Sequence, residues 1–130
     1  MKTKQYLNAL AEYLKERHAR IMDLETEAMR FLKSGDTKSY ADNMRAKAEL
    51  LSGIGEEAQD LLAPLPGELR FNLALALDRF ASGARNALSL NSVFYMSALL
   101  YPDDQKQGIP DNLMACISRI EQEGENFSPT

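Results

Sequence analysis

The segment KSGDTKSY, residues 33–40, predicts that the chain reverses direction within a few residues. Gly35 suits the left-handed backbone conformation that often ends a helix, because glycine has no Cβ to clash there. Asp36 or Thr37 can accept hydrogen bonds from the first free amide groups of a following helix. Because the connection is so short, it predicts two antiparallel helices that pack against each other.

The segment before this turn has the spacing of one long amphipathic helix over residues 3–33. Its apolar residues recur alternately three and four positions apart, with one break at Arg17. These residues are Leu7, Leu10, Leu14, Ile21, Leu24, Ala28 and Phe31. At ~1.5 Å per residue the helix would reach about 45 Å, whereas a compact sphere of this chain is only about 36 Å across. The spacing therefore predicts either an elongated bundle or a helix with one end packed on another subunit.

A second helix is predicted over residues 37–62, where one apolar stripe continues through six positions. These are Tyr40, Met44, Leu51, Ile54, Ala58 and Leu61. Gly53 and Gly55 each weaken a helix by up to ~1 kcal/mol relative to alanine. They therefore predict a kink, a break or a close contact with a neighbouring backbone. Pro64 and Pro66 end this helix, because proline cannot continue its hydrogen bonding.

Three further helices are expected over residues 66–88, 92–101 and 110–124. The first of them carries apolar residues on more than one face, which predicts that it lies at the centre of the bundle. The sequence thus predicts an all-α fold, an elongated helical bundle of about five helices built on a long antiparallel N-terminal hairpin. Residues 1–124 are expected to form a single domain and residues 125–130 a flexible tail.

The short helix expected over residues 92–101 contains no charged residue. Such a helix is either part of the core or a surface that becomes buried on association. We expect one stripe to pack inward and the remainder to contribute to an interface. The candidate interface residues are Phe94, Tyr95, Leu99 and Tyr101. A fully internal helix and a small-molecule pocket lined by these aromatic residues are the alternatives.

Charge and composition exclude several classes of function. The net charge is -4, and basic residues are matched or outnumbered by acidic ones in both halves, so nucleic acid is not an expected partner. The longest uncharged stretch, residues 86–102, is too polar for a bilayer, so no membrane association is expected. The single cysteine, Cys116, lies on an apolar stripe and predicts a buried, unreactive thiol in a reducing cytoplasm. Residues 14–20, LKERHAR, are expected to form either a solvated basic face or a contact for an anion or an acidic partner.

Catalytic signatures are weak. His18 is the only histidine, and Lys15 occupies the position where the Glu-x-x-His pattern of di-iron bundles needs a glutamate. We therefore expect no catalytic residues, no metal site and no cofactor. The acidic cluster of Glu56, Glu57 and Asp60 offers an alternative metal or nucleotide site, although the matching acidic pair that such a site needs is missing from the next helix.

The predicted function is therefore that of a non-catalytic helical interaction or assembly protein, an adaptor or chaperone-like molecule. We expect its partner to be a second copy of itself in a homodimer, another protein, or both, bound through apolar helix faces. The alternative is a small all-α enzyme or ligand-binding bundle that uses Glu56, Glu57 and Asp60.

Overall fold

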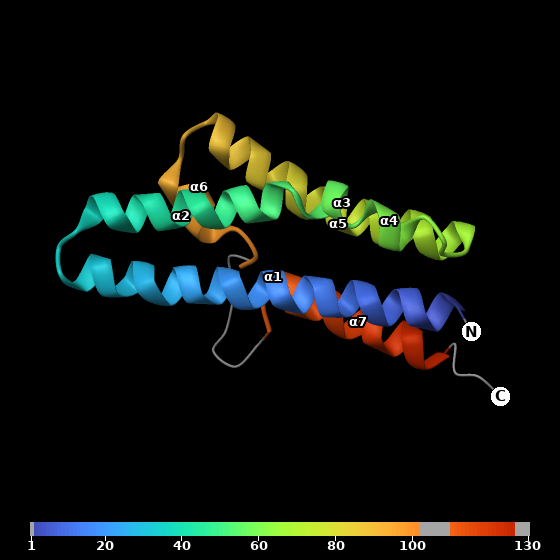
Figure 1. Cartoon of the computed structure of the whole chain (residues 1–130). Helices are drawn as coiled ribbons and strands as arrows, with labels where there is room; N and C mark the ends of the chain where they lie inside the picture. The colour runs from blue at the N-terminus through green and yellow to red at the C-terminus, as the bar shows by residue number, and fades with distance from the viewer. Residues whose placement is uncertain (1, 102–109, 127–130) are drawn as a thin grey trace.

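A computed structural model describes residues 2–101 and 110–126 of the chain, and every regular element in this part is a helix (Figure 1). The helices are α1 (Lys2–Lys33), α2 (Thr37–Ser52), α3 (Ile54–Glu57), α4 (Gln59–Leu62), α5 (Gly67–Ser89), α6 (Val93–Ala98) and α7 (Asn112–Asn126). The predicted all-α bundle is confirmed, with α2, α3 and α4 occupying the range expected for one helix. Among the described residues, no helix combines the length and the apolar composition that a membrane span requires.

The turn between α1 and α2 has the predicted chemistry. Gly35 adopts a φ of 83°, and the amide of Asp36 donates to the carbonyl of Phe31 at 2.8 Å, which is the hydrogen bond of a glycine-terminated helix. The carboxylate of Asp36 then accepts a hydrogen bond from the amide of Ser39 at 3.0 Å and so caps α2. Helices α1 and α2 consequently form the long hairpin seen in Figure 1.

The predicted weak point in the second helical region is a break. Helix α2 ends at Ser52. Gly53 separates it from the short helix α3, and Ala58 separates α3 from the short helix α4. A Cβ added at Gly55 would lie 3.9 Å from the backbone of Leu77, which is ordinary van der Waals contact, so Gly55 faces α5 at a distance that would also accommodate alanine. The break redirects the chain so that α3 and α4 follow the surface of α5.

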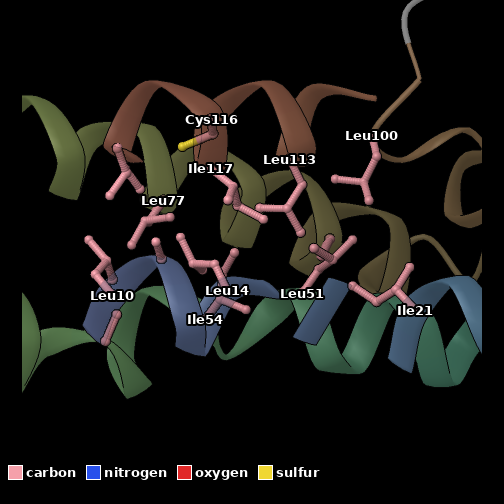
Figure 2. Close-up of a cluster of buried hydrophobic side chains, with 14 of the residues drawn as sticks. Leu10, Leu14, Ile21, Leu51, Ile54, Leu77, Leu100, Leu113, Cys116 and Ile117 are labelled. Carbon is pink, nitrogen blue, oxygen red and sulfur yellow. The ribbon is translucent and has the colours of Figure 1, made fainter. Parts of the chain in front are cut away.

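The other helices pack on the hairpin from two sides. Helix α7 runs antiparallel to the N-terminal half of α1, and α5 covers α2, α3 and α4 (Figure 1). Side chains from both sides meet in one core, which includes Leu14 of α1, Leu77 of α5 and Ile117 of α7 (Figure 2). Each of these three side chains is fully buried.

The prediction that the helix over residues 66–88 lies at the centre of the bundle is wrong for its first half. Phe71 and Leu75 of α5 are 65% and 40% exposed, and the buried residues of α5 lie on one face that begins at Leu77. Helix α1, which contacts α2, α4 and α7, shares the central position with α5, which contacts α2, α3, α4 and α6.

The last two helices differ from expectation at their ends. Helix α6 stops at Ala98, before the extended backbone of Leu99 and the positive φ of Leu100, 78°. Helix α7 begins after Asp111, whose carboxylate accepts a hydrogen bond from the amide of Met114 at 2.8 Å, and it extends two residues beyond the predicted end of the domain at Gly124. Residues 127–130 of the expected tail lie outside the described part of the chain.

Candidate functional site: the turn between α5 and α6

Three large apolar side chains are exposed within six residues at the junction of α5 and α6. Leu90, Phe94 and Tyr95 are 57%, 74% and 51% exposed, and we call these three residues the apolar turn. The rings of Phe94 and Tyr95 lie 5.8 Å apart between centroids and are tilted by 57°. Exposed apolar side chains that lie close together mark interaction sites more often than isolated ones do.

The backbone of the apolar turn is fixed by its own sequence. Asn91 adopts a φ of 50°, a conformation that asparagine tolerates better than most residues. The amide of Ser92 donates to the carbonyl of Ala87 at 3.1 Å and closes the end of α5. The hydroxyl of Ser92 then accepts a hydrogen bond from the amide of Tyr95, also at 3.1 Å, and caps α6. The two aromatic residues are therefore presented from a defined backbone rather than from an unstructured loop.

Helix α6 is held to the α1–α2 hairpin by a buried ion pair. The ammonium of Lys47, a fully buried residue of α2, lies 2.8 Å from Oε2 of Glu25 on α1. The same ammonium donates to the carbonyl oxygen of Ser97 at 3.1 Å and lies 5.1 Å from the centre of the Tyr101 ring. The hydroxyl of Tyr101 donates to Oε1 of Glu25 at 2.5 Å. One charged pair thus anchors both α6 and the residues that follow it.

Burial changes the acidity of this group of side chains. Loss of hydration lowers the pKa of Lys47, and its hydrogen bond with Glu25 opposes that change. Burial also raises the pKa of Tyr101, and here the neighbouring carboxylate of Glu25 adds to the effect. A low-dielectric surrounding therefore disfavours every charge that lacks a direct partner, which makes the pairing of Glu25 with Lys47 necessary for this arrangement.

The four predicted interface residues fall into two groups. Phe94 and Tyr95 lie on the exposed side of α6, whereas Met96 on the opposite side is fully buried. Leu99 is half-buried and packs against the core. Tyr101 is also half-buried and hydrogen-bonds to Glu25, so its ring belongs to the anchor of α6.

The acidic residues of the alternative site do not converge. Glu57 turns toward α1, where it accepts a hydrogen bond from the hydroxyl of Tyr13 and pairs with Nε of Arg17 at 3.4 Å. Burial, followed by the bond to Glu57, raises the pKa of Tyr13 to about 12. Glu56 instead lines a hollow between α3, α4 and α5, and Asp60 is exposed on α4. No group of three or more potential metal ligands is found among the described residues.

The basic segment LKERHAR is divided among several partners inside the molecule. Lys15 pairs with Glu121 of α7 at 2.5 Å, and Arg17 pairs with Glu57 of α3. His18 Nε2 lies 2.7 Å from Oδ2 of Asp111, at the start of α7. Successive residues of a helix point in different directions, so these side chains reach different helices and do not form one basic face.

Sequence reasoning missed two polar contacts that each involve one buried side chain, Glu25 with Lys47 and His18 with Asp111. The sequence did contain a signal for the contact between Glu25 and Lys47, because Lys47 falls between Met44 and Leu51 on the apolar stripe of α2. A charged residue on such a stripe is rarely buried without a partner, and that partner can come only from another helix.

The fold of the chain is that of an all-α helical bundle. Comparison with known protein families, curated proteins and solved structures found no match for it.

Proposed function

We propose that this chain is a non-catalytic helical interaction protein that forms a homodimer through the apolar turn of Leu90, Phe94 and Tyr95. The observation that carries the proposal is the exposure of these three residues on a backbone held by capping hydrogen bonds. Leaving a large apolar side chain in water costs roughly 1.5 to 3 kcal/mol relative to burying it. Aromatic residues also supply the rigid contact area that is enriched at association hot spots.

Charge supports a second copy as the partner. Residues 86–102 contain no charged side chain, so the apolar turn itself brings no like charges to a two-fold contact, and its charged neighbour is Arg45 of α2, which donates to Asn91. A two-fold dimer needs such a self-complementary surface, because the same residues meet on both sides of the axis. An adaptor or chaperone-like role would then depend on other faces of the dimer, which remain open to further proteins.

The test is the oligomeric state of a Phe94→Ser/Tyr95→Ser variant in analytical ultracentrifugation. We expect the wild type to sediment as a dimer and the variant as a monomer with an unchanged far-ultraviolet circular dichroism spectrum. Phe71→Ser/Leu75→Ser is the matched control, since it removes two exposed apolar residues from the first half of α5, outside the apolar turn. Tyr101 is kept, because its hydroxyl is bonded to Glu25 and its replacement would disturb the fold.

Two results would count against the proposal. A wild type that stays monomeric at high micromolar concentration would exclude self-association. A control variant that dissociates as completely as the Phe94→Ser/Tyr95→Ser variant would move the interface to α5.

A further inference from the structure

A second surface feature lies on the hairpin, between α1 and α2. It is a groove of about 550 Å³ that extends to Glu57 at the end of α3. Its lining residues are spaced three and four apart on each helix, so each helix contributes a single stripe. They are Arg20, Asp23, Leu24 and Glu27 from α1, Ala46, Glu49 and Leu50 from α2, and Glu57 from α3.

The floor and the walls of this groove differ in chemistry. The floor is apolar, because Leu24, Ala46 and Leu50 are half-buried there. The small side chain of Ala46 leaves room above it. The walls carry four carboxylates and one guanidinium. The groove is therefore both apolar and strongly acidic.

Some of the acidic residues already have partners within the molecule, and two do not. Glu57 is bonded to Tyr13 and Arg17, and Glu27 accepts a hydrogen bond from Asn43 at 3.0 Å. Across the described part of the chain, the carboxylates of Asp23 and Glu49 make no hydrogen bond or ion pair. These two lie on opposite helices, one on each wall.

We propose that this groove binds a basic amphipathic helix of a partner protein. In this arrangement apolar side chains of the partner would cover Leu24 and Leu50, and its lysine or arginine residues would lie beside Asp23 and Glu49. Laying the apolar face of a helix into a groove is a common mode of peptide recognition. The charge of the walls selects a cationic partner and rejects an acidic one.

The length of the groove favours a helix over a small cation. The stripe from Arg20 to Glu27 covers about 10 Å of α1 at ~1.5 Å per residue. A partner helix of two turns places several cations along that length, with apolar residues between them, whereas a single amine would satisfy one carboxylate only. The inference goes beyond the homodimer proposed above, because none of the groove residues belongs to the apolar turn.

The experiment measures binding of a fluorescently labelled synthetic helix of leucine and lysine by fluorescence anisotropy. Leucine occupies every third or fourth position of the probe, and lysine fills the remainder. We expect saturable binding that weakens as salt is added, because the contacts are exposed and screened. Two altered probes serve as comparisons, one with glutamate in place of lysine and one with serine in place of leucine, and we expect neither to bind.

The site is assigned by a variant of the two carboxylates without partners, Asp23→Asn/Glu49→Gln. This variant should weaken binding of the probe by about three- to tenfold, the range expected for two exposed ion pairs. The matched control is Asp60→Asn/Glu68→Gln, which removes the same charge from exposed positions outside the groove and should bind as the wild type does.

Three outcomes would overturn the inference. The first is a probe affinity that is the same for the groove variant and the wild type. The second is equal binding of the serine probe, which would mean that the apolar floor is not used and that charge alone attracts the probe. The third is displacement of the probe by equimolar spermine, which would identify the ligand as a small polyamine. The Phe94→Ser/Tyr95→Ser variant should retain full probe binding, so failure of the homodimer and failure of the groove are distinguishable.

Discussion

At the scale of single residues, the buried pair of Lys47 and Glu25 does more to define the structure than any exposed charge. An ammonium removed from water loses hydration energy that one carboxylate restores only in part. Lys47 therefore also uses the carbonyl of Ser97 and the ring of Tyr101. These additional contacts connect α2 to the segment that displays the apolar turn.

We expect Lys47→Met to reduce the free energy of unfolding by about 2–4 kcal/mol. Methionine fills most of the same space, but it leaves Glu25 without a cation, and breaking a buried pair in this way is strongly destabilising. The measurement is urea denaturation followed by circular dichroism. The double variant Lys47→Met/Glu25→Gln should lose at least ~1 kcal/mol less than the sum of the two single variants, because the two residues interact directly. Additive losses would show that the pair contributes no coupling energy.

At the scale of elements, the α1–α2 hairpin depends on one backbone conformation. Gly35 has a φ of 83°, and no atom lies within 4 Å of where its Cβ would be. The cost of a side chain at this position is consequently conformational and not a matter of space. Asp36 adds the second half of the turn by capping α2.

The Gly35→Ala variant should therefore be less stable by about 1–2 kcal/mol, the cost of placing an L-residue in the left-handed region. Thermal denaturation should show a lower midpoint. Gly67→Ala is the matched control, because an added Cβ there also meets no atom within 4 Å and the backbone has no positive φ. Alanine at this helical position should be neutral or stabilising. Equal melting temperatures for both variants would contradict the strain that we assign to the turn.

At the scale of the whole molecule, one core joins the two sides of the bundle. Leu10 and Leu14 of α1 meet Leu77 of α5 and Ile117 of α7 in this core (Figure 2). Helix α7 contributes Ile117 and Cys116 to this core and follows a part of the chain, residues 102–109, that the structure does not describe. Its attachment to the described part of the bundle rests on packing, on the ion pair between Lys15 and Glu121 and on the contact between His18 and Asp111.

The thiol of Cys116 reports on that attachment. Burial raises its pKa, so the native protein should react slowly with Ellman's reagent. In urea, thiol labelling and loss of helical ellipticity should occur at the same concentration, because a single core unfolds in a single transition. The control variant Cys116→Ala/Ser118→Cys places a thiol on the exposed face of α7 and should react quickly in the native state. Labelling of Cys116 at a clearly lower urea concentration would mean that α7 detaches on its own.

The sequence by itself determined the features that depend on neighbours along the chain. Helical spacing, the cap at Asp36, the left-handed Gly35 and the weak point at Gly53 could all be predicted, because a helix and its ends are governed by contacts within about four residues. The sequence also predicted that the helix around Phe94 and Tyr95 packs one side inward and leaves the other at the surface, since a short uncharged helix is poorly solvated on every face.

Apart from the α1–α2 hairpin, only the tertiary structure decided which helices meet. Whether Glu25 reaches Lys47, whether Glu57 turns away from Glu56, and whether Phe71 stays exposed depend on how distant segments are placed against one another. Composition and periodicity do not specify that placement, because several packings of the same amphipathic helices bury similar apolar area. The buried pair and the anchoring role of Tyr101 arise from contacts between residues 22 and 76 positions apart, and the acidic groove likewise forms between residues of different helices. Such contacts exist only once the bundle has formed.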